Sequence, residues 1–256
     1  MGAILAVFGI ALRDTLANRR SFFVQVGLML ANDVTWLVFW ALFFHRVGTI
    51  RGWTLDDVYV LFAILLVCSG VAAGLLANAR KVGQLAADGE LDGVLALPVA
   101  TLGYVLVRRI DTALLGDLAL GPVVFLAFGH PTTERFAVFV VGSALGSIVL
   151  VGFLVSLGSL TFFTGGRGEQ SDLGFQAVTM LANYPLDVFG GRTRLLLFSV
   201  VPAAFVSGLP ARLVRELSPG TALALAAAAA GFAGAGFALF ELGLRRYASG
   251  SLFRSP

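Results

Sequence analysis

The sequence predicts an all-α polytopic membrane protein with about six transmembrane helices, and three observations support this fold class. Hydrophobic residues make up 58% of the 256 residues, and the mean hydropathy is +0.90. Charged residues make up only 13%, about half the share of a typical soluble domain. Apolar runs near the ~20 residues that cross a bilayer recur along the chain. A water-soluble fold cannot bury this much apolar surface, so we expect one membrane domain over residues 1–256.

The first expected element is an N-terminal interfacial helix over residues 1–20. Its apolar residues follow helical spacing at Ile4, Leu5, Phe8, Leu12 and Leu16. Arg13 and Asp14 fall on other sides of the same helix, which is typical of a helix that lies in the plane of the membrane surface. The segment has no basic run before its apolar part and no clear cleavage site, so we do not expect a signal peptide.

Six apolar segments follow that qualify, or nearly qualify, as transmembrane spans. They are residues 22–44, 58–78, 103–128, 136–164, 195–210 and 220–244. The fifth is short and contains Pro202, which removes a backbone hydrogen bond and is expected to bend the helix. Residues 172–194 are ambiguous because Pro185 and the paired glycines Gly190-Gly191 interrupt them. They form either an interfacial helix or the first half of a broken fifth span.

The distribution of Lys and Arg predicts that both termini face the cytoplasm of a cell membrane. With both ends inside, the inner segments hold eleven of these residues and the outer loops hold five, while Arg108 and Arg109 lie near the inner end of the third span. Positive residues are enriched on the cytoplasmic side of membrane proteins. The acidic turn between spans two and three is therefore expected inside.

The sequence contains no motif that indicates an enzyme. It has no GxxxxGK[ST] phosphate loop and no HExxH, and its only histidines, His45 and His130, fall at the outer ends of spans. The single Cys68 excludes an intrachain disulfide. The basic residues gather at the ends of apolar runs, which indicates membrane orientation and no nucleic-acid partner. We expect no catalytic residue, no metal site and no cofactor in this chain.

Polar residues inside the expected spans are candidates for a substrate path. Asn32 and Asp33 fall near the middle of span one, and Asp111 and Asp117 lie along span three. A mid-membrane Asp costs roughly 2.5–3.5 kcal/mol on insertion scales, so these side chains should face protein or water. They either line a path or form buried structural pairs. Arg108 and Asp111 have the i, i+3 spacing of such a pair.

The acidic turn lies within residues 86–98, where Asp88 is placed to cap a short helix that ends at Pro98. Leu91, Val94 and Leu95 then share one face of that helix. Acids in a first turn satisfy free N–H groups and complement the helix dipole. The same layout also suits a helix offered to a cytoplasmic partner, with an apolar stripe for a groove and acids at its rim. Both interpretations are open at this point.

Two stretches resemble signatures of one branch of the type-2 ABC transporter permeases. "GELDGVLALPV", from residue 89, is similar to the signature G-E-L-D-x-x-L-x-x-P, and "YPLDVFGGRTRLLLFSVVPAAFVSGLPA", residues 184–211, is similar to that branch's second signature. The resemblance extends over the chain in length, span order and topology. It implies a six-span permease that pairs with an identical or different permease and with two ATPase subunits, which bind ATP and Mg.

The resemblance also implies roles for particular residues in an exporter. The loop between spans two and three would be the coupling helix that docks on the ATPase, and the matching positions here are Gly89, Glu90, Leu91, Asp92, Leu95 and Pro98. Pro202 and Pro210 would belong to a broken span next to the outer gate, unless they form a structural kink only. One departure is Ala-Leu at positions 96 and 97, where an Arg often precedes the proline.

Two other classes of function stay open on the sequence alone. An ion-coupled secondary transporter or channel would use Asp33 and Asp111 to bind ions, but it would be expected to show related halves, which this sequence lacks. A lipid-modifying membrane enzyme would need clustered acids at one membrane face, where Glu90 and Asp92 are the only candidates. Nothing in the sequence selects a substrate, or a homodimer over a heterodimer.

Overall fold

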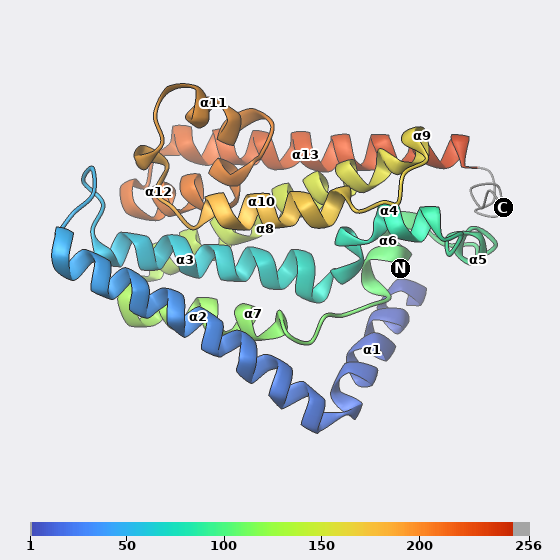
Figure 1. Ribbon diagram of the computed structural model, residues 1–256, viewed down its shortest axis with the longest axis horizontal. Helices are drawn as coiled ribbons and strands as arrows, with labels where there is room; N and C mark the ends of the chain where they lie inside the picture. Colours follow the sequence, from blue (N-terminus) through green and yellow to red (C-terminus); the bar gives the residue numbers. More distant parts are fainter. Residues whose placement is uncertain (1, 248–256) are drawn as a thin grey trace.

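A computed structural model describes residues 2–247, so Met1 and residues 248–256 of the expected domain, Arg254 among them, lie outside the described residues. The described chain is all-α (Figure 1). Its α-helices are α1 Gly2–Ala17, α2 Arg19–Val47, α3 Leu55–Ser69, α4 Val82–Ala87, α5 Asp92–Leu95, α6 Thr101–Val107, α7 Leu115–Phe128, α8 Thr133–Ser159, α9 Thr161–Thr164, α10 Gln170–Ala182, α11 Gly191–Ser199, α12 Leu209–Glu216 and α13 Pro219–Arg246. Four short π or 3₁₀ segments accompany them, at Gly70–Leu75, Ala77–Arg80, Leu186–Val188 and Ala204–Gly208.

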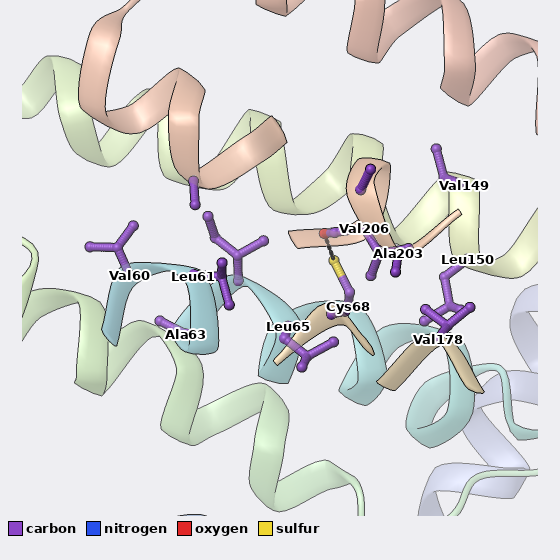
Figure 2. Close-up of a cluster of buried hydrophobic side chains, with 14 of the residues drawn as sticks. Val60, Leu61, Ala63, Leu65, Cys68, Val149, Leu150, Val178, Ala203 and Val206 are labelled. Carbon is purple, nitrogen blue, oxygen red and sulfur yellow. Dashed lines mark hydrogen bonds between the residues drawn. The ribbon is translucent and has the colours of Figure 1, made fainter. Parts of the chain in front are cut away.

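Helix α8 lies at the centre of the bundle, between α3 and α13. Close approach of α8 and α13 depends on glycine, because a Cβ added to Gly236 would lie 2.7 Å from the carbonyl oxygen of Gly152. Helix α3 is mostly buried, whereas α2 diverges from the bundle and exposes most of its surface (Figure 1). Figure 2 shows the core around Cys68 of α3, whose Sγ contacts the carbonyl oxygen of Val206 at 3.4 Å.

The bundle has two ends, which we name by what lies there. The "terminal end" holds the start of α1, helices α4 to α6 and the end of α13, and the "loop end" holds the α2–α3 connection and the Leu186–Val188 turn (Figure 1). Helix α1 is a separate element, as expected, because Asn18 interrupts the chain and caps α2 through Ser21. Its position in a membrane interface stays a prediction.

The chain has fewer clear spans than the six expected. Among the described residues, four helices are long and apolar enough to cross a membrane, and a bent pair adds a fifth only if it counts as one span. The shorter helices α7 and α10 also run lengthwise along the bundle (Figure 1). The structure is that of an all-α polytopic membrane protein.

The expected third span over residues 103–128 is not one helix. It divides into α6 and α7, and residues 108–114 between them are not helical. The break is stabilised at Asp111, whose backbone N–H donates to the carbonyl oxygen of Gly74 and whose Oδ1 accepts from the N–H of Ala113. The expected pair of Arg108 with Asp111 is not formed, because Arg108 bonds Glu90 and the helical spacing between them is lost.

The expected fifth span over residues 195–210 is not one continuous helix, and the separate helix α10 runs lengthwise before it. Asp172, near the start of α10, pairs with Arg80 at 2.8 Å towards the terminal end, and Asp187, just after α10, accepts from Trp53 at the loop end. The following segments, Gly191–Ser199 and Ala204–Glu216, are bent by 80°. Arg194 and Arg212, from the two arms of the bend, both contact Asp187, so the bent pair enters and leaves at the loop end.

This correction changes the charge count that predicted the orientation. Arg192 and Arg194, which the sequence placed inside, lie after α10 and towards the loop end. Arg108, in turn, contacts Glu90 of the terminal end, and Arg109 follows it in the chain. The terminal end loses two arginines and gains two, while the loop end gains two, so the excess of positive residues becomes smaller but still lies towards the terminal end. That this end is cytoplasmic stays a prediction.

Candidate functional site

The segment over residues 86–98 is not the single helix that the sequence predicts. It consists of the end of α4, a turn, and the four-residue helix α5. Gly89 has a φ of +76°, a conformation that a residue without a Cβ adopts at low cost, and it reverses the chain between the two helices. Asp88 therefore follows the end of α4 and does not cap a new helix, since α5 begins at Asp92.

The apolar stripe expected on this segment is mostly used inside the chain. Leu91 and Val94 are 0% and 3% exposed and pack with Val105 of α6 and Phe240 of α13. Of the three stripe residues only Leu95 is exposed. The expectation that all three face a partner is wrong, because helical spacing defines a stripe without saying what covers it.

The outer surface of this segment is acidic and partly apolar. We call it the terminal loop surface, and its exposed residues are Asp88, Glu90, Asp92, Gly93, Leu95, Ala96, Leu97 and Pro98. Arg108 donates to Glu90 at 2.5 Å, which ties the loop to the end of α6. Because both side chains are partly exposed, this pair contributes little to global stability. Its effect is local, since it fixes the position of the loop relative to α6.

A second candidate site lies between α2, α3, α7 and α10, and we call it the midspan cavity. Its volume is about 490 Å³, and it brings together Asn32, Asp33 and Asp117, three of the four residues that the sequence selected. Asp33 lies at the midpoint of α2 and is 2% exposed, and Asp117 is 1% exposed. Both carboxyl groups line this cavity, and Asn32 Nδ2 donates to Asp33 Oδ1 at 3.4 Å.

Asp111, the fourth selected residue, lines a different cavity nearer the terminal end. This terminal cavity has a volume of about 420 Å³. Its charged lining residues are Arg80, Lys81, Arg109, Asp111 and Asp172. Asp33 and Asp111 therefore line separate spaces and cannot hold one ion together. Both cavities lie between α2 and α10, on the side of the bundle where α2 diverges (Figure 1).

The sequence was compared with known families and proteins. The profile of a family described as ABC-2 family transporter protein matches residues 30–251. The chain belongs to the ABC-2 transporter family. It is a multi-pass membrane permease of an ABC transporter and not itself an enzyme. Searches of curated proteins and of solved structures gave no match.

Sequence reasoning missed the contribution of α10 to the midspan cavity of this ABC-2 permease. Gln176, Thr179 and Asn183 line the cavity from α10, at helical spacing i, i+3 and i+7. That spacing was visible in the sequence. It has meaning only once residues 170–182 are known to be a helix, and the ambiguity of residues 172–194 concealed it.

The two prolines of the second signature occupy different positions in this ABC-2 permease. Pro202 lies in the break between α11 and the Ala204–Gly208 segment, where the 80° bend occurs. Pro210 is buried near the start of α12, against α8, because a Cβ added to Gly142 would meet Pro210 Cβ at 3.3 Å. Pro210 therefore lies where α12 packs closely against α8. A role of either proline in gating stays a prediction.

An ion cluster at the loop end of the permease was not predicted. Asp187 accepts from Trp53 Nε1 at 2.8 Å and from Arg212 Nη2 at 2.6 Å, and Arg194 lies 3.6 Å away. Burial alone raises the pKa of Asp187, but the hydrogen bonds from Arg212 and Trp53 outweigh it and hold the pKa below its ordinary value. The cluster joins the α2–α3 connection to the bent pair.

Proposed function

We propose that this permease is the membrane subunit of an ATP-driven exporter, and that it works as a dimer with separate ATPase subunits. The ATP and Mg would be bound by those ATPase subunits, and the permease would supply the substrate path. The observation that carries the proposal is the terminal loop surface, where Glu90 and Asp92 of the segment that resembles the ABC-2 signature are exposed. The acidic and apolar character of this surface suits a partner with a basic, apolar groove.

The packing beneath the loop gives a physical route for coupling. Leu91 and Val94 anchor the loop in a core that includes Val105 of α6 and Phe240 of α13. Arg108 adds a polar link to the start of the α6–α7 break. A displacement of the loop by a closing ATPase dimer would therefore move α6 and α13 directly. For ATP to bias the permease, the two permease states must differ in their contacts with the loaded ATPase.

Exposed polar groups on α2 and α10 support a second permease at this side. Asn32 is exposed at the middle of α2, and Gln176 is exposed on α10. Polar side chains are costly in hydrocarbon and usually face protein or a water-filled space. A second permease, identical or different, would cover this side of the bundle and enclose a path along the midspan and terminal cavities.

Co-purification with the ATPase tests the docking site. The double variant Glu90→Lys/Asp92→Lys reverses the charge of the terminal loop surface without touching Leu91 or Val94. We expect loss of the ATPase from the purified complex, or loss of ATP-coupled transport. The matched control is Asp56→Lys, an exposed acid at the loop end that pairs with His130, and it should assemble normally. Normal assembly and coupling of the double variant would refute docking at this surface.

A further inference from the structure

The midspan cavity presents hydrogen-bond acceptors that have no donor. Asp33 Oδ2, Asp117 Oδ1 and Asn183 Oδ1 are buried and make no hydrogen bond to a donor within the described residues. All three residues line the cavity, from α2, α7 and α10. Buried polar atoms in folded proteins nearly always have a partner. Three unpaired acceptors around one space indicate a ligand that brings donors.

Several donors at the cavity bond to other groups of the chain. Asn183 Nδ2 donates to the carbonyl oxygen of Thr179 at 2.8 Å, and the Thr179 hydroxyl donates to that of Phe175 at 2.9 Å. Asn32 Nδ2 donates to Asp33. An anionic ligand would therefore lie against unpaired oxygens and two buried carboxyl groups. A cation with N–H groups satisfies them.

The charge and shape of the cavity narrow the class of cation. The carboxyl groups of Asp33 and Asp117 are both buried and line the same space, so a cation held there offsets the cost of burying negative charge. Four aromatic residues line the same space, namely Trp36, Phe62, Phe175 and Tyr184. Aromatic faces attract cations and pack apolar ligand surface. The volume, about 490 Å³, lies in the range of small-molecule pockets.

A metal ion fits the cavity less well than an organic cation does. No group of three or more His, Cys, Asp or Glu side chains able to hold a metal occurs in residues 2–247. The two carboxyl groups leave the remaining lining to amide, hydroxyl and aromatic groups. We propose that the midspan cavity binds an amphipathic organic cation with N–H donors, as the substrate of the exporter. This inference rests on the proposed function, since it names the substrate class of the same path.

Ligand binding to the permease in zwitterionic lipid nanodiscs tests the inference. The probe is ethidium, a flat aromatic cation with two amino groups, and its uncharged parent diaminophenylphenanthridine is the control ligand. We expect saturable ethidium fluorescence enhancement and no saturable signal from the uncharged parent. Asp33→Asn and Asp117→Asn should each weaken binding by at least about tenfold, or ~1.4 kcal/mol. The control variant Asp56→Asn, at the loop end and in the lining of neither cavity, should bind as the wild type does.

A substitution at an exposed position tests the effect of charge on binding even if the buried Asp variants fail to fold. Gln176 is exposed at the edge of the midspan cavity, so Gln176→Lys adds a positive charge without disturbing the core. It should weaken ethidium binding more than the uncharged replacement Gln176→Leu does. Absence of saturable binding by the wild type, equal binding of both ligands, or unchanged binding in all three charge variants would overturn the inference.

The same preparations separate this inference from the proposed function. Each variant is also co-purified with the ATPase. Normal assembly with no ethidium binding by the wild type would overturn the substrate class and leave the exporter proposal intact. Ethidium binding by a wild-type chain that never assembles with an ATPase would overturn the exporter proposal and leave the cation site intact.

Discussion

Replacement of Asp187 by alanine tests how the loop end is held together. Asp187 is the shared acceptor for Trp53 and Arg212 and lies 3.6 Å from Arg194, so one substitution removes the centre of the cluster. Trp53 belongs to the α2–α3 connection, and the two arginines belong to the bent pair. The substitution therefore detaches these elements from each other without creating a cavity in the helical core.

The magnitude follows from what each partner loses. Trp53 is 1% exposed, so its indole N–H would be left buried and unpaired, at a cost of about 1–3 kcal/mol. The arginines are partly exposed and reach water, so each lost ion pair contributes about 0–1 kcal/mol. We expect a loss of about 2–3 kcal/mol. For a chain of this size that lowers Tm by about 4–12 °C.

The assay is thermal unfolding in detergent, followed by tryptophan fluorescence. The control is Asp56→Ala, which removes only an exposed pair with His130 and should change Tm little. Because the folded-state pKa of Asp187 is lowered, its contribution is complete above the unfolded pKa of about 3.9 and is lost as pH falls through the folded value. The difference between wild type and variant should stay constant from pH 5 to about pH 8 and shrink only in acid. An unchanged Tm in Asp187→Ala, or a Tm difference between wild type and variant that shrinks as pH rises, would show that the Asp187 cluster does not stabilise the loop end.

Two further predictions concern packing and orientation. A Cβ at Gly146 would lie 2.6 Å from the carbonyl oxygen of Val206, so Gly146→Ala should destabilise the permease by about 1–3 kcal/mol. The control is Gly27→Ala, where an added Cβ has nothing within 4 Å, and it should be neutral or slightly stabilising. Equal Tm values for the two variants would argue against this packing. Cysteines introduced at Ala96 and Val188 should react differently with a membrane-impermeant maleimide, because the two positions are exposed at opposite ends. In intact cells Val188→Cys should be labelled and Ala96→Cys protected until the membrane is permeabilised, and labelling of both from outside would contradict the orientation.

The sequence predicted the fold class and the long apolar helices, because these depend on composition and length. It failed where polar residues line a cavity or where a hydrogen bond joins distant parts of the chain, because hydropathy contains no information about such contacts. The region of helix α10 was ambiguous because Pro185 and Gly190-Gly191 break the longer segment, and the polar residues Gln176, Thr179 and Asn183, which line a cavity, lower its hydropathy. The break after α6 was missed because it depends on backbone bonding of Asp111 to Gly74, a contact between residues far apart in sequence.

The candidate sites were predictable to different degrees for similar reasons. Asn32, Asp33 and Asp117 were found because polar groups in apolar runs are conspicuous, and the cavity brings them together. Their assignment to a substrate path remains a prediction. Leu91 and Val94 were assigned to the outer surface because periodicity identifies a stripe, but their burial depends on Phe240, almost 150 residues away. Tertiary packing of that kind leaves no local signal.

The account depends most on contact between the terminal loop surface and an ATPase, and site-specific photo-crosslinking measures that contact directly. A photoreactive amino acid replaces Leu97 on the terminal loop surface or, as the control, Val188 at the loop end. The two side chains are 43% and 40% exposed, so they are equally available to a partner. The account predicts that position 97 crosslinks in the membrane to a nucleotide-binding subunit and that position 188 does not. Absence of that product at position 97, or the same product from both positions, would contradict it.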